Sequence, residues 1–73
     1  MKLDQQEQAV VIGNTIMMLG GHEEVTKYVD PQKLAKVSEI HNELYDNTTP
    51  RERREAMIRL LDKTMDEFLK QQT

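Results

Sequence analysis

The chain has 73 residues, of which 37% are hydrophobic and 32% are charged, and its formal net charge at pH 7 is -3. This length predicts a single domain over residues 1–73, because a second hydrophobic core would not fit. The absence of Cys excludes a disulfide framework, a thiolate nucleophile and a thiolate metal site. The acidic balance argues against general affinity for nucleic acid, which requires a basic surface.

The N-terminal region lacks the pattern of a secretory signal or a membrane span. Lys2 is followed by Asp4 and Glu7, and the first apolar stretch, from Ala9 to Gly20, contains polar residues and is about 12 residues long. A membrane span needs roughly 20 apolar residues. We therefore expect a cytoplasmic protein without a membrane segment.

The first predicted helix has a clear start and a clear stop. Asp4 is a good N-cap residue, and Glu7 stands three positions later, which completes the pattern of a capping box. Gly20 and Gly21 then provide a left-handed stop after the apolar run. Apolar residues in this helix point in nearly every direction, so we expect a second copy or another protein to cover part of it. The alternative is a central helix with some exposed apolar side chains. The residues assigned to self-association are Val10, Gly13, Met17 and Met18.

Two later start signals define the remaining helices. Asp30 precedes Pro31, and Thr49 precedes Pro50 with Glu52 completing a second capping box. No segment alternates in the manner of a strand. The signals predict an all-α bundle of three principal helices, over about residues 4–19, 31–45 and 50–70, with a short helix near 22–29.

The last helix has an apolar stripe and a charged face. We expect the stripe to pack and the charged face, which carries pairs of opposite charge four residues apart, to be solvated. The stripe consists of Met57, Leu61, Thr64, Met65 and Phe68, and the charged pairs are Glu55–Arg59, Lys63–Glu67 and Asp66–Lys70.

Three arginines stand in the first turn of the last helix, where the helix dipole disfavours cations. Arg53 and Arg54 project near the apolar stripe at Met57, and Arg51 lies close by. Arginines beside apolar, Met-containing surface suit a partner with an acidic rim or a phosphate. We assign partner binding to Arg51, Arg53, Arg54 and Met57. In the alternative interpretation the neighbouring glutamates neutralise the arginines and nothing binds there.

No pattern in the chain indicates catalysis, a metal site or a cofactor. Ser38 stands three residues from His41, but no glycine-rich elbow accompanies the pair. His41 has no good metal ligand three or four residues away, and the glycines form no phosphate-binding pattern. We therefore assign no catalytic, metal-binding or cofactor-binding residue.

The function expected by elimination is that of a non-catalytic regulatory module which binds a larger protein and is itself a homodimer. The alternative is a small DNA-associated transcriptional regulator that uses the basic cluster of the last helix. The helix over 31–45 is a poor major-groove reader because it carries several acidic residues.

Overall fold

The computed structural model describes residues 1–72 and confirms the all-α fold within that range. It contains three helices of more than three turns and one of a single turn, and no strand is present among the described residues. The helices are α1 (Gln5–Met18), α2 (His22–Val25), α3 (Pro31–Asp46) and α4 (Pro50–Lys70).

The predicted start and stop of α1 are both present. The Asp4 carboxylate accepts a hydrogen bond from the Glu7 backbone N–H at 2.8 Å, and the Glu7 carboxylate accepts one from the Asp4 N–H at 2.9 Å. At the other end Gly20 has a φ of 106°, and the Gly21 N–H donates to the Ile16 carbonyl at 2.9 Å. A left-handed glycine after the last turn is a common way to satisfy the terminal carbonyls of a helix.

The starts of α3 and α4 also follow the sequence signals. The Asp30 carboxylate accepts from the Gln32 N–H at 3.0 Å. Thr49 and Glu52 exchange the two hydrogen bonds of a capping box, each of 3.1 Å. Pro occupies the first turn of both helices, where its missing N–H costs nothing.

The short helix α2 ends earlier than the sequence predicts, at Val25 and not at residue 29. The N–H groups of Lys27 and Tyr28 donate to carbonyls three residues back, at Glu24 and Val25. These tighter turns follow α2, and Asp30, the residue before Pro31, leaves the α-helical conformation with a ψ of 119°.

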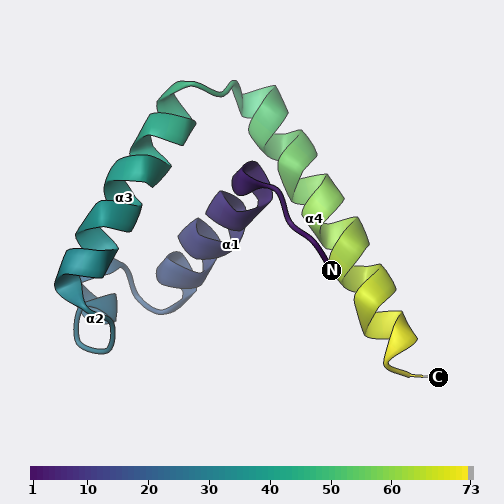
Figure 1. Cartoon of the computed structure of the whole chain (residues 1–73), viewed down its shortest axis with the longest axis horizontal. Helices are drawn as coiled ribbons and strands as arrows, with labels where there is room; N and C mark the ends of the chain where they lie inside the picture. The colour runs from purple at the N-terminus through teal and green to yellow at the C-terminus, as the bar shows by residue number, and fades with distance from the viewer. Residues whose placement is uncertain (73) are drawn as a thin grey trace.

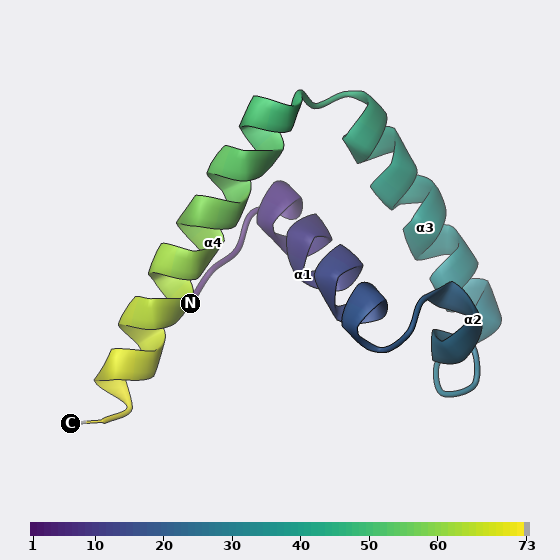
Figure 2. The same ribbon diagram turned by 180° about the vertical axis from the view of Figure 1, so that it is seen from behind.

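The helices form a small bundle with the outline of an open V (Figure 1). Figures 1 and 2 show α3 and α4 diverging from the loop that joins them, with α1 lying between them. The short helix α2 lies beside the end of α3 that is far from this loop. The molecule measures 39 × 29 × 19 Å along its principal axes. The buried apolar side chains among the described residues are Val25, Leu34 and Ala56. So small a core stabilises a chain of this length weakly.

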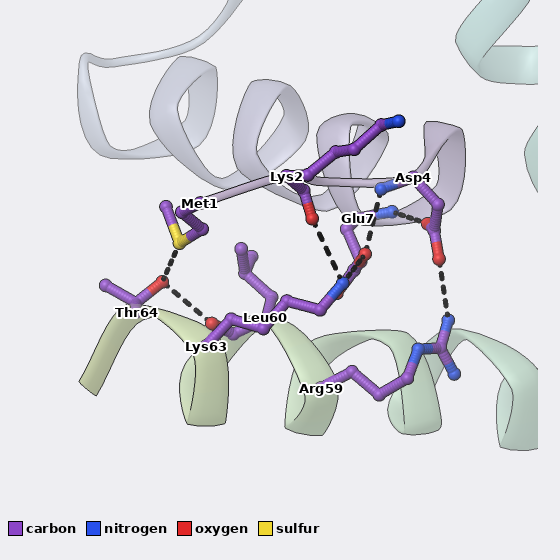
Figure 3. A network of polar contacts seen from close by, with 8 residues as sticks. All are labelled: Met1, Lys2, Asp4, Glu7, Arg59, Leu60, Lys63 and Thr64. Carbon is purple, nitrogen blue, oxygen red and sulfur yellow. Dashed lines mark hydrogen bonds and ion pairs between the residues drawn. The ribbon is translucent and has the colours of Figure 1, made fainter. Parts of the chain in front are cut away.

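A polar clasp joins α1 to the middle of α4 (Figure 3). The Glu7 side chain is fully buried, and its Oε1 accepts from the Lys63 Nζ at 2.7 Å. The same Nζ also donates to the Lys2 carbonyl at 3.2 Å, and Arg59 pairs with Asp4 at 3.5 Å. Ala56 of α4 is buried and lines a cavity with Ala9 and Val10 of α1, so its small side chain faces α1.

The clasp overturns one expectation about α4. Arg59, Lys63 and Glu67 were expected on a solvated face, but Arg59 and Lys63 contact α1 and its cap, and Glu67 lies 3.9 Å from the N-terminal ammonium. Lys63 pairs with Glu7 of α1 and Arg59 pairs with Asp4, the N-cap residue of α1, and among the described residues neither pairs with the glutamate four positions away on α4. Part of the charged face of α4 is therefore turned toward α1 and the N-terminal segment, while Glu55, Asp66 and Lys70 are exposed as expected.

The clasp also predicts an acid sensitivity. The hydrogen bond from the Glu7 backbone N–H lowers the pKa of Asp4 below 3.8, with Arg59 and Lys63 adding to the effect against partial desolvation. A folded-state pKa below that of the unfolded chain stabilises the fold at higher pH, and this contribution is lost as the pH falls through the folded-state value. Asp4→Asn keeps a good N-cap but cannot titrate.

We therefore expect the wild type to lose more of its free energy of unfolding than Asp4→Asn between about pH 5 and about pH 2.5. Urea titrations at both pH values would measure the difference. Equal losses in the two proteins would contradict the prediction.

Candidate functional site

The apolar stripe of α4 faces solvent, although the sequence predicted that it would pack. Its six large side chains are each between 48% and 62% exposed. No other described helix covers them, because α4 turns its Ala56 and Lys63 side toward α1. We call this surface the α4 stripe; it consists of Met57, Ile58, Leu61, Met65, Phe68 and Leu69.

A groove of about 530 Å³ runs beside the N-terminal half of the α4 stripe, between α1 and α4. Three residues of the stripe, Met57, Ile58 and Leu61, form part of its wall. Val10 and Asn14 line it from α1, and Arg54, Leu60 and Thr64 complete it from α4. We call it the α1–α4 groove. The C-terminal half of the stripe, from Met65 onward, lies beyond this groove.

A second groove, of about 370 Å³, lies on the other side of α1 and is almost entirely apolar. We call it the α1–α2–α3 groove. Lys33 is the one charged residue in its lining. The apolar lining residues are Val11, Ile12, Ile16 and Leu19 of α1, Val25 of α2, Val29, and Leu34 and Val37 of α3, with Thr15 beside them.

The residues predicted for self-association on α1 lie on different surfaces. Met17 and Met18 are 74% and 88% exposed near the end of the helix. Val10 is half-buried in the α1–α4 groove. Gly13 faces α3 of the same chain, where an added Cβ would lie 3.0 Å from the His41 Nε2. The close approach at Gly13 is therefore explained within the chain.

His41 makes use of the space that Gly13 leaves. Its Nε2 lies 3.2 Å from the Ala9 carbonyl oxygen, which can only accept, so Nε2 carries the proton in this contact. The ring is half-buried between α1 and α3. Ser38 lines a cavity with His41 but shares no hydrogen bond with it among the described residues. The arrangement is a helix crossing and does not present a nucleophile with its base.

The predicted arginine cluster is divided by the structure. Arg53 donates to the Tyr45 carbonyl at 3.0 Å and the Thr48 carbonyl at 2.7 Å, and its guanidinium lies 3.9 Å from the centroid of the Tyr45 ring. Arg51 pairs with Glu55 at 3.2 Å. Only Arg54 and Met57 line the α1–α4 groove together, and no residue in the range 1–72 pairs with Arg54.

The guanidinium of Arg53 is engaged within the chain, and its assignment to partner binding stays a prediction. Arg53 closes the last turn of α3 and holds the loop before α4, in a role that no short-range sequence pattern indicates. Arg53→Met should lower the free energy of unfolding by about 1–1.5 kcal/mol, because it removes charged hydrogen bonds and a cation–π contact. Arg51→Met, which breaks an exposed pair, should change it by about 0.5 kcal/mol or less. Urea denaturation of both variants would check this, and equal effects would contradict it.

Within residues 1–72 no group of three or more His, Asp or Glu side chains is arranged to hold a metal ion. No described helix combines the length and apolar character of a membrane span. Comparisons of the chain with protein-family models, curated proteins and solved structures find no match. The surfaces described above therefore carry the functional argument.

Proposed function

We propose that this chain is a small non-catalytic interaction module of the cytoplasm, which forms a homodimer and binds a larger protein. The observation that carries the proposal is the exposed surface of the protomer, 6078 Å². A compact protein of 8.5 kDa exposes about 4,650 Å², so the protomer exposes about 1,400 Å² more than its mass requires. A standard protein interface buries about 800 Å² per partner, so this excess is enough for an interface and part of a second.

The α1–α2–α3 groove is the surface that best suits the larger partner. Its lining is apolar over three helices, with Lys33 at one point. An amphipathic helix that carries an acidic residue would bury its apolar side there and pair with Lys33. The α4 stripe is separate from this groove, so one chain can hold a second copy and a partner at the same time.

The test is a capture experiment with a matched pair of variants. Leu19→Glu places a charge in the α1–α2–α3 groove at an exposed position, and Tyr28→Glu places one at an exposed position outside the lining. A protein captured from lysate by the wild type, identified by mass spectrometry and then purified, should bind Leu19→Glu at least about tenfold more weakly and Tyr28→Glu equally well. Equal binding by all three proteins, or no specific capture, would contradict the proposal.

The alternative, a DNA-associated regulator, receives less support. Two of the three arginines of the basic cluster are engaged within the chain, at Tyr45, Thr48 and Glu55. That leaves Arg54 as the cation of the cluster available to phosphates. Titration with a DNA duplex at low and high salt decides the matter, because several phosphate contacts would give a steep loss of affinity with salt.

A further inference from the structure

We propose that the α4 stripe is an antiparallel dimer interface, in which Met65 and Phe68 of each copy fill the α1–α4 groove of the other. This inference rests on the homodimer in the proposed function and assigns the surface that forms it. It differs from the sequence-based expectation, in which α1 supplies most of the contact.

The spacing of the stripe is that of two helices packed along a seam. Ile58, Leu61, Met65 and Phe68 follow one another at intervals of three, four and three residues. This is the apolar repeat by which one helix presents a continuous edge to another. All four side chains are about half exposed or more in the protomer, so none is committed to its own core.

The two halves of α4 have complementary shapes. The N-terminal half carries the α1–α4 groove, whose walls on α4 extend from Arg54 to Thr64. The C-terminal half carries Met65, Phe68 and Leu69 on a helix face that α1 does not flank. An antiparallel pair places the C-terminal half of each α4 in the α1–α4 groove of the other copy. A parallel pair sets groove against groove and leaves the cavities unfilled.

Charge favours the same orientation. Residues 50–60 contain four arginines and two glutamates, whereas residues 61–72 contain two lysines and three acidic residues. Arg53, Arg59, Lys63 and Glu67 contact their own chain, so these charges act on a second copy only through the net charge of each half, +2 for residues 50–60 and -1 for residues 61–72. An antiparallel pair sets these halves of opposite net charge against each other, and it also opposes the two helix dipoles. A parallel pair would place Arg54 against its own counterpart at the edge of the apolar repeat.

In the antiparallel register Ile58 lies opposite Phe68 of the second copy, and Leu61 lies opposite its Met65. The twofold axis then crosses α4 between Leu61 and Met65. Asp62 approaches its counterpart near this axis, on an exposed flank where solvent and salt screen the repulsion. The same patch serves both copies, as a twofold interface requires.

The first experiment is sedimentation equilibrium of three variants and the wild type. The wild type should give about twice 8.5 kDa at micromolar concentration. Leu61→Glu and Phe68→Glu should raise the dimer dissociation constant about 100-fold or more, because each buries a charge in the interface. Met18→Glu, at an exposed position of α1 outside the stripe, should leave it unchanged. Circular dichroism reports whether each variant is helical.

The second experiment measures the relative orientation of the two α4 helices in a dimer whose α4 stripe is unchanged. The chain contains no Cys, so Arg51→Cys provides a single site for a nitroxide label. At about 1.5 Å per residue, the antiparallel pair separates the two labels by about 36 Å, whereas a parallel pair brings them within about 20 Å. Pulsed electron paramagnetic resonance distinguishes these distances, and it does so even where Leu61→Glu fails to fold.

Three results would overturn the inference. A short label distance would exclude the antiparallel pair, and a dimer that survives Phe68→Glu but not Met18→Glu would assign the interface to α1. A wild type that stays monomeric would remove the homodimer itself. None of these results would contradict partner binding in the α1–α2–α3 groove, because that proposal is tested separately with Leu19→Glu.

Discussion

Lys63→Met is expected to lower the free energy of unfolding by about 3 kcal/mol. The Lys63 ammonium lies 2.7 Å from Oε1 of Glu7, whose side chain is fully buried and whose Oε2 has no hydrogen-bond partner. Met keeps most of the apolar stem but leaves the buried carboxylate without its cation. Because the protomer has so small an apolar core, this loss is a large share of its stability.

The matched control is Lys27→Met. Lys27 also pairs with a glutamate, Glu24, at 2.9 Å, but its side chain is 64% exposed. An exposed pair contributes little, so this variant should change the free energy of unfolding by about 0.5 kcal/mol or less. Urea denaturation at one fixed protein concentration would compare the two. If Lys63→Met were as mild as Lys27→Met, the clasp would not be what holds α1 to α4.

The helix boundaries were predictable because their causes are local. The capping boxes at Asp4 and Thr49 and the paired glycines after α1 involve residues within a few positions of one another. Signals of this range can be read directly from a sequence. The early end of α2 has no such local signal, because Pro31 restricts only Asp30 and α2 ends five residues earlier, at Val25.

The orientation of α4 was not predictable in the same way. Hydrophobic periodicity identifies the apolar face of a helix, but it does not say whether its own chain or another chain covers that face. The prediction that the stripe packs assumed that other helices of the same chain cover it. In the structure α4 instead faces α1 and its N-cap with Ala56, Arg59 and Lys63, and the side chains of the α4 stripe are exposed.

The contacts that hold the helices together, and so shape the candidate site, connect residues in different parts of the sequence. Glu7 and Lys63 are separated by 56 positions, and His41 and Ala9 by 32. Neither pair has a short-range signature. Arg53 and Tyr45 are only eight positions apart, but a loop separates them, so no helical spacing indicated their contact. A single sequence therefore suggested the residue types but not their partners.

Gly13→Leu should separate α3 from α1 and lower the free energy of unfolding by about 2 kcal/mol. The new side chain would begin with a Cβ 3.0 Å from the His41 Nε2 and would have to displace the ring from the Ala9 carbonyl. Overpacking of this kind costs about 3 kcal/mol, and the better helix propensity of Leu returns about 1 kcal/mol. Amide exchange should accelerate over residues 31–46, while the contact of α1 with α4 persists.

A second substitution, His41→Ala, tests whether the contact between residue 13 and His41 causes the destabilisation by Gly13→Leu. In the Gly13→Leu background it removes the ring that the new side chain meets, so the double variant should recover at least about 1 kcal/mol of the lost free energy of unfolding. In the wild-type background His41→Ala should instead be destabilising, because it empties the space beside Gly13 and removes the hydrogen bond to Ala9. If His41→Ala raises the free energy of unfolding in the Gly13→Leu background and lowers it in the wild type, the Gly13–His41 contact is the junction of α1 and α3. Additive losses would locate that junction elsewhere, at Leu34 and Val25, where the small apolar core lies.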